Sequence, residues 1–462
     1  MMLHFFQEYK NLLLQASLAV SLTLFVVFLQ IPSLVLGGLH TYIHPDSYGQ
    51  QNGAKAAIKR PSSSNSGSGI EGYQYLSSKS GLDVKKRSKS KEKFEFDESN
   101  AQIFRLKLDE GHLQSRIYFS DYRYSFICSL VALSGLLLSK YLGVVEHSGV
   151  LANGTLIPVI LGFASLGKVL VSLARTFLEK SASKRSERQL SAVAGVLGFG
   201  FGLMICSGIG NSIFDFDLVS VDAFGRVCVA LLMGCLALFL YIPAAKSARS
   251  FWLGTDQIRS NLEIISCGWF GRIMLYANFV LVFFTALLWI NPLAELLVNK
   301  NTDHTRVTEM DGTFGSAKLV GNVGFAPLEF IRLRHWLLLI SGLLQILTLR
   351  ANLQMYLNEA VLSWYQHLHA SKVPDLDFSR AKVFLHNHCL CLVALQFFAL
   401  PILVLLFLGL SQIDDNSFGK SLACIAVLKG IALFMAWWIA FIWAVFTSTN
   451  LFLYRRGILY VS

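Results

Sequence analysis

A lysine lies inside one of the most apolar stretches of this sequence. The segment VILGFASLGKVLVSLARTF runs from Val159 to Phe177 and contains Lys168. A lysine at the centre of a bilayer costs about 2.5–3.5 kcal/mol on translocon scales, so it is by default a candidate functional residue. Lys168 precedes Arg175 by seven residues, about 10 Å along a helix, and its aliphatic stem can also carry the ammonium toward the membrane interface. Lys168 is therefore either a polar site or a snorkelling anchor.

Further polar side chains fall within the apolar stretches. They are Asn278, Gln345, Gln396 and Lys429. Hydrogen bonding between helices is the ordinary role of such amides. No Asp or Glu lies deep in an apolar stretch, which disfavours a proton- or cation-coupled carrier. Two buried cations instead favour an anion, a lipid headgroup or an ion pair between Lys168 and Asp121, which stands at the end of a stretch.

The sequence motifs that could bind a metal or a nucleotide do not form a site. HNHCLC, from His386 to Cys391, offers four metal-capable side chains, but a helix would point them in different directions, and zinc needs four converging ligands. GFGFG (Gly198–Gly202) lies within an apolar stretch, where glycines allow close helix packing. P-loop, GxSxG and HExxH motifs are missing from the sequence. We therefore expect no catalytic residue, cofactor or metal, and a protein that is not an enzyme.

Long apolar runs dominate the composition and define the fold class. Of the 462 residues, 54% are hydrophobic and 15% are charged, against about a quarter charged in a typical soluble domain. Runs of about 20 apolar residues span a bilayer as helices, because lipid offers no partner for exposed backbone groups. Nine such runs are found, at residues 12–31, 124–143, 155–175, 190–209, 226–245, 273–297, 334–350, 388–410 and 422–446. The sequence predicts an all-α integral membrane protein, a bundle of eight or nine transmembrane helices.

The loops between these runs alternate in charge, which predicts the orientation. Loops 37–120, 176–189 and 246–272 hold thirteen, four and four Lys and Arg residues, whereas loops 144–153 and 210–225 hold none. The positive-inside rule then places the N-terminus outside and the C-terminus in the cytoplasm. The net charge of +11 has the same explanation, so we expect no nucleic acid partner. The compartment is either the endomembrane system or the plasma membrane.

The first run and the first outer loop leave questions open. Residues 1–36 read as an N-terminal transmembrane helix, with a signal peptide as the alternative, although no A-x-A cleavage site follows. The sequon NGT at Asn153 falls in a loop assigned to the outside and is a candidate N-glycosylation site.

The soluble segments divide the rest of the chain. Residues 37–120 form a basic loop that we expect to be largely disordered, with the linker PSSSNSGSG at residues 61–69 and the run KKRSKSKEK at Lys85–Lys93. That run is either a solvated tract or a contact for anionic lipid headgroups. IFRLKLDE, from residue 103, predicts one short strand. The helical membrane bundle occupies residues 121–450, and a cytoplasmic tail follows at 451–462.

Two cytoplasmic stretches have an apolar residue every three to four positions. One begins at Ala248 after the fifth run and has Lys246 and Arg249 on its polar face; the other begins at Leu353 after the seventh run. This periodicity predicts two amphipathic helices. They either lie on the membrane surface or pack under the bundle.

Several short segments of the chain resemble the transmembrane protein 161 family. They are LLWINPL (Leu287–Leu293), LRANLQMYLN (Leu349–Asn358), VALQFFALP (Val393–Pro401), GKVLVSL (Gly167–Leu173) and YIHP (Tyr42–Pro45). The order of elements is also similar: one N-terminal span, a basic hydrophilic loop, then a run of spans. The resemblance extends from about residue 118 onward. It implies a polytopic membrane protein with no established enzymatic activity or catalytic residues.

Two functions follow as hypotheses. The first is a protein that regulates or mediates ion or small-solute flux, with Lys168 near a polar path. The alternative is a membrane scaffold, or a lipid-binding or interaction protein without transport, in which Lys168 is structural. Membrane lipids are partners in either case, and protein partners are not identifiable from the residues.

Overall fold

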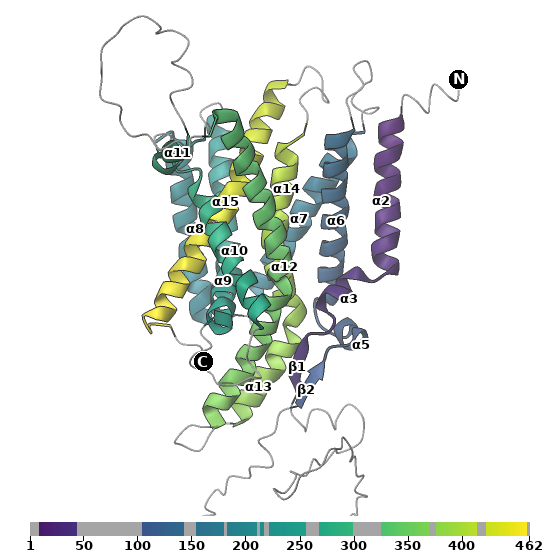
Figure 1. Ribbon diagram of the computed structural model, residues 1–462, viewed down its shortest axis with the longest axis vertical. Helices are drawn as coiled ribbons and strands as arrows, with labels where there is room; N and C mark the ends of the chain where they lie inside the picture. The colour runs from purple at the N-terminus through teal and green to yellow at the C-terminus, as the bar shows by residue number, and fades with distance from the viewer. Residues whose placement is uncertain are drawn as a thin grey trace, which may run out of the picture.

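A bundle of long helices makes up the protein (Figure 1). The computed structural model describes residues 9–43, 104–142, 154–179, 183–209, 213–216, 221–255, 268–298, 325–368, 376–413 and 422–459. Among these residues, nine helices are long and apolar enough to cross a membrane. The bundle confirms the predicted all-α polytopic membrane fold.

The elements follow one another along the chain with these bounds. The membrane-crossing candidates are α2 (Lys10–Phe28), α6 (Phe119–Tyr141), α7 (Leu156–Leu178), α8 (Arg185–Cys206), α9 (Ala223–Thr255), α10 (Trp269–Leu287), α12 (Pro327–Leu368), α14 (Leu390–Ser411) and α15 (Leu422–Arg455). The shorter elements are α3 (Ile31–Leu36), β1 (His40–Ile43), β2 (Phe104–Lys107), α5 (Glu110–Gln114), α11 (Asn291–Leu297) and α13 (Leu376–His388).

Helix α14 forms the centre of the bundle. Its most apolar stretch is completely buried, and α6, α7, α9, α12 and α15 all contact it. A helix that is apolar on every side can be buried in this way, because it has no polar face to solvate. By contrast, α2 lies at one edge (Figure 1) and exposes large side chains such as Leu24 and Phe28, which face lipid in a membrane.

The sixth predicted span is broken, so the expectation of one helix over 273–297 is wrong at its end. Helix α10 ends at Leu287 and α11 begins at Asn291, with Pro292 in its first turn. Proline lacks an N–H and fits only the start of a helix. The freed backbone groups are paired across the break, because Asp215 N donates to Trp289 O at 3.2 Å and Asn291 N donates to Ile213 O at 2.8 Å.

The two amphipathic stretches are helical, but they continue spans instead of forming separate helices. Helix α9 runs unbroken for 33 residues and α12 for 42. In the described part of the first stretch, Ala248 and Phe251 are buried, and in the second Leu353 and Trp364 are buried. They therefore pack against the bundle. The first stretch beyond residue 255 lies outside the described residues.

Glycines bring α8 and α9 into close contact. A Cβ built on Gly198 would lie 2.6 Å from Ala237 Cβ, and one on Gly234 would lie 2.9 Å from Phe199 Cβ. Only residues without a side chain allow this approach. The prediction that GFGFG serves helix packing is confirmed for Gly198 and Gly202, whereas a Cβ on Gly200 would have no atom within 4 Å.

A small two-stranded sheet lies against the lower end of the bundle (Figure 1). β1 and β2 pair antiparallel, with His40 opposite Lys107, so the predicted strand in IFRLKLDE is confirmed. β1 also docks on α12: His40 N donates to Gln354 Oε1 at 2.9 Å, and Tyr42 Oη donates to Asn358 Oδ1 at 3.1 Å. The segments YIHP and LRANLQMYLN are therefore in contact through Tyr42 and Asn358. We expected the whole 37–120 loop to be largely disordered, but residues 37–43 and 104–120 contain β1, β2, α5 and the start of α6. Residues 44–103 lie outside the described part of the chain.

Candidate functional site

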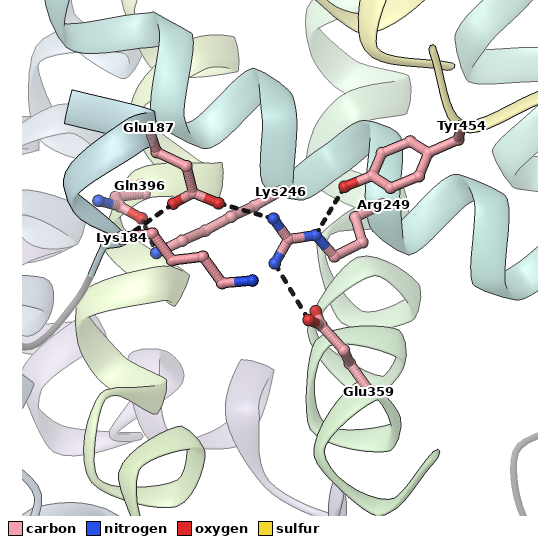
Figure 2. Close-up of polar contacts among 7 residues, drawn as sticks. All are labelled: Lys184, Glu187, Lys246, Arg249, Glu359, Gln396 and Tyr454. Carbon is pink, nitrogen blue, oxygen red and sulfur yellow. Dashed lines mark hydrogen bonds and ion pairs between the residues drawn. The ribbon is translucent and has the colours of Figure 1, made fainter. Parts of the chain in front are cut away.

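A buried arginine of α9 is bonded to side chains of three other helices (Figure 2). Arg249 of α9 donates through Nη2 to Glu187 Oε1 of α8 at 2.7 Å and through Nη1 to Glu359 Oε1 of α12 at 3.0 Å. Its Nε donates to Tyr454 Oη of α15 at 2.9 Å. We call these four residues the Arg249 network. All three guanidinium nitrogens have a partner, so the network fixes the relative positions of four helices.

The chemistry of the network explains why arginine occupies this position. The exposed fraction of the Arg249 side chain is 14%, and that of Glu359 is 6%. A planar guanidinium can serve carboxylates in different directions without losing its charge. Burial of ions is costly unless each has partners, and here two carboxylates share one cation. Glu187 also accepts from Lys184 N at 3.3 Å, at the N-terminus of α8, where the helix dipole favours an anion.

A second buried cation lies one turn before Arg249. Lys246 of α9 is 6% exposed and donates from Nζ to Gln396 Oε1 of α14 at 3.0 Å. Its Nζ also lies 6.0 Å from the centre of the Tyr356 ring, within the range of a cation–π contact. Gln396 thus brings the ionic region into contact with the central helix (Figure 2).

Polar side chains continue from this region into the apolar interior. Two small cavities, of about 20 and 10 Å³, share the lining residues Ser247, Asn278, Asn352 and Trp443. Gln345 lines the second. We call the two cavities together the amide pocket. It is formed by α9, α10, α12 and α15, with α14 closing one side.

Among the described residues, three side-chain oxygens around the amide pocket have no hydrogen-bond partner. They are Asn278 Oδ1, Gln345 Oε1 and Asn352 Oδ1, and their residues are 9%, 6% and 7% exposed. A buried acceptor without a donor costs about 1–3 kcal/mol. A cavity of 10–15 Å³ holds one water, and a water donates to acceptors of this kind. The amide pocket therefore has the size and chemistry of an internal hydration site.

Helix α13 packs against α12 and brings His386 and Lys382 within electrostatic range of Glu359 in the Arg249 network. Burial lowers the pKa of His386 below its ordinary value of 6.5, and Glu359 opposes that shift. Burial also lowers the pKa of Lys382, again against the attraction of Glu359. His386 stacks on Tyr356 with ring centres 4.7 Å apart. α13 thus adds titratable groups to the edge of the site.

The structure places Lys168 away from this site. Lys168 Nζ of α7 lies 3.5 Å from Asp121 Oδ1 of α6, and Arg175 Nη1 lies 3.6 Å from the same oxygen. The Lys168 side chain is 33% exposed. Asp121, the candidate ion-pair partner, is in contact with Lys168, but neither residue lines the amide pocket.

The other predicted site residues are divided among several places. Asn278 and Gln345 come together in the amide pocket, and Gln396 contacts Lys246 beside it. Lys429 of α15 is not among the residues that line the amide pocket. Asn153 and the run Lys85–Lys93 lie outside the described residues.

The HNHCLC residues occupy separate environments. His386 stacks on Tyr356, His388 stacks on Phe384, and Cys391 is completely buried at the start of α14. In the described ranges, no group of three or more His, Cys, Asp or Glu side chains could hold a metal ion.

Sequence reasoning missed the Arg249 network. Lys246 and Arg249 are three residues apart and share one helix face, which was interpreted as the polar face of an amphipathic stretch. Glu187 and Glu359 were not singled out, because each lies near the expected end of a span. The sequence did contain one signal, two cations on one helix face at a spacing of three residues. The neighbouring residues in the sequence do not show that carboxylates from α8 and α12 pack against these cations.

The fold and its exposed apolar helices define a multi-pass integral membrane protein. The family model described as "Predicted transmembrane protein 161AB" matches residues 219–418. Over these residues, the match confirms the resemblance to the transmembrane protein 161 family. LLWINPL, LRANLQMYLN and VALQFFALP lie within the matched part, as do Lys246, Arg249 and the three amides. No curated protein and no solved structure matches the chain.

Proposed function

We propose that this chain is a non-enzymatic membrane protein that mediates or regulates ion or small-solute flux through the polar interior beside α14. The observation that carries the proposal is the set of three unpartnered amide oxygens around the amide pocket. Polar groups inside a membrane bundle are costly and mark a pathway or binding site by default. In an apolar scaffold, leucine or methionine would fill the same space without that cost.

The charges at the lower end of the polar interior balance one another. Lys246 and Arg249 lie there with Glu187 and Glu359, and Ser247, which lines the amide pocket, stands between the two cations in α9. An ion that entered would lose its hydration, and neither this balanced entrance nor the neutral pocket beyond it offers a net charge to offset that cost. We therefore expect neutral polar solutes to pass in preference to ions.

A variant of matched volume tests the role of the amides. The triple substitution Asn278→Leu, Gln345→Met and Asn352→Leu removes the polar lining and nearly preserves side-chain size. In vesicles that contain the purified protein, we expect the flux of glycerol to fall at least tenfold. Replacing polar groups by apolar groups of similar shape is nearly neutral for stability, so the thermal unfolding midpoint should stay close to that of the parent.

A regulatory role needs a second measurement. Whole-cell currents in cells that express the parent or the triple variant at equal surface level would report regulation of another conduit. If the vesicles show no flux above protein-free controls and the two sets of cells carry equal currents, the flux proposal is wrong. The alternative of a scaffold or interaction protein would then hold.

Two peripheral features belong to the proposal as well. We propose that Lys85–Lys93 contacts anionic lipid headgroups, at about 1 kcal/mol for each basic residue near the surface, and that Asn153 carries an N-glycan. Replacing the basic residues of the run by glutamine should reduce the binding of a peptide of residues 80–97 to phosphatidylserine vesicles. Asn153→Gln should abolish the change in gel mobility on glycosidase treatment. Equal peptide binding, or no mobility change in the parent, would contradict the respective claim.

A further inference from the structure

An open cavity lies on the side of the bundle, distant from the Arg249 network. It has a volume of about 380 Å³ and is lined by α6, α12 and α14. The lining residues Lys140, Arg332 and Gln412 stand at the end of α6, in the second turn of α12 and just after α14. These positions place the cavity at the end of the bundle opposite α13 (Figure 1).

One end of the cavity is cationic. Lys140 and Arg332 are both exposed, and Lys140 Nζ donates to Gln412 Oε1 at 3.5 Å. In the part of the chain that the structure describes, neither cation lies within ion-pair distance of a carboxylate. His335 also lines the cavity, with Nδ1 2.8 Å from Ile331 O. Two charges at one rim, neither of them paired with a carboxylate among the described residues, match an anionic group.

The other end is apolar, and the cavity is as deep as one leaflet. Leu133 on α6 stands seven residues before Lys140, and Leu343 on α12 stands eleven residues after Arg332. At 1.5 Å per residue, the apolar wall extends about 10–16 Å below the cationic rim. Half of a hydrocarbon core of about 30 Å has the same depth.

Aromatic side chains mark the level of the rim. Tyr141 and Trp336 line the cavity and are 79% and 61% exposed. Tyrosine and tryptophan favour the boundary between headgroups and hydrocarbon, where one part of the ring is wet and the other apolar. The rim therefore lies at headgroup level and the leucine wall lies in the acyl region.

We propose that this cavity binds one phospholipid with an anionic headgroup. Its phosphate contacts Lys140 and Arg332, and its acyl chains lie along Leu137, Leu343 and Leu405. The apolar wall selects a lipid over free phosphate, because only a lipid replaces the bilayer contacts of the leucines. The volume lies within the range of about 300–1,000 Å³ that is usual for ligand pockets.

Lipid retention by the purified full chain tests the proposal. The protein is placed in nanodiscs of phosphatidylcholine with one tenth phosphatidylglycerol, extracted into mild detergent, and examined by native mass spectrometry. We expect one retained phosphatidylglycerol per chain. Lys140→Gln and Arg332→Gln should each weaken retention about fivefold, the equivalent of about 1 kcal/mol for each basic residue near the surface.

Two further variants separate charge from shape. Leu137→Trp fills the apolar part without changing charge and should displace the lipid, whereas Arg123→Gln removes an exposed cation near the start of α6, outside the cavity lining, and should leave retention unchanged. Equal retention of phosphatidylcholine and phosphatidylglycerol would overturn the proposal. That result is expected if Asp414 and Asp415, which follow Gln412 in the sequence, neutralise the cationic rim. Unchanged retention in the Lys140, Arg332 and Leu137 variants would overturn it too.

Discussion

Arg249 of α9 and Glu359 of α12 are 110 positions apart in the sequence, yet Nη1 and Oε1 lie 3.0 Å apart in the buried end of the bundle. The contact joins the parts of α9 and α12 that extend below their most apolar stretches. With Glu187 and Tyr454, it holds four helices at the lower end of the polar interior. A change in this network would therefore reach the amide pocket, since Ser247 precedes Arg249 by two residues.

Removal of the arginine charge should destabilise the protein strongly. Arg249→Met leaves Glu187 and Glu359 buried without their cation, and breaking a buried pair costs about 3–5 kcal/mol. The triple variant Arg249→Met, Glu187→Gln and Glu359→Gln removes all three charges and should recover most of the loss, because neutral replacement of a buried ion cluster is often nearly neutral. Thermal unfolding in detergent measures both. If the triple variant is as unstable as the single one, packing of the arginine stem matters and its charge does not.

The contact of α13 with the bundle should weaken as the pH falls below 6.5. Burial lowers the pKa of His386 from its ordinary 6.5, so the folded protein binds fewer protons than the unfolded chain in this range. Stability is then complete above 6.5 and is lost as the pH falls from 6.5 toward the lowered pKa. Tyr356, Glu359, Lys382 and Lys246 surround the imidazole, and the two lysines oppose its protonation.

Hydrogen exchange of α13 at pH 7.5 and 5.5 measures this effect. After each rate is divided by the intrinsic rate at its own pH, we expect lower protection of α13 at the lower pH in the parent. His386→Phe keeps an aromatic ring on Tyr356 and removes the titration, so its protection should change much less between the two pH values. The same pH dependence in parent and variant would show that another group is responsible.

A single methyl group should separate two helices. Gly198→Ala puts a Cβ 2.6 Å from Ala237 Cβ, whereas a Cβ on Gly200 has no atom within 4 Å. Overpacking of this kind costs about 1–3 kcal/mol, and Gly200→Ala should be neutral or slightly stabilising because alanine favours a helix. Unfolding midpoints of the two variants provide the comparison. Equal midpoints would mean that α8 and α9 are not in close contact in the membrane.

The hydropathy of the sequence was sufficient to predict the transmembrane spans, because a run of about 20 apolar residues is long enough to cross the bilayer as a helix. The break between α10 and α11 was missed, although Pro292 is a local signal, since the surrounding residues are as apolar as a span. The Asn278–Gln345 proximity and the Arg249 network could not be predicted, since each depends on which helices are neighbours. Hydropathy shows which residues share a helix face and does not show what covers it. Lys246 illustrates the point: its position in a basic loop region predicts exposure, and α14 buries it.

The orientation of the membrane crossings is open to a direct test. Positive-inside reasoning places residues 37–120 in the cytoplasm, so an Asn-X-Thr site introduced within residues 60–70 should receive no glycan. The positive control is a site in loop 144–153, which a short polar insertion moves away from the membrane surface. We expect this site to be glycosylated. A glycan on the first site would reverse the assignment and would favour cleavage of residues 1–36 as a signal peptide.

The lysine that is most conspicuous in the sequence should matter less than the amides. Lys168 is one third exposed and shares Asp121 with Arg175, and ion pairs of this exposure contribute about 0.2–1 kcal/mol. Helices α6 and α7 are also joined by Ser129 Oγ and Ser165 Oγ, which lie 3.1 Å apart. Lys168→Met should therefore lower the unfolding midpoint only slightly and leave vesicle flux at the parent level. Loss of flux in a well-folded Lys168→Met protein would move the polar path to the α6–α7 side and would contradict its location in the amide pocket.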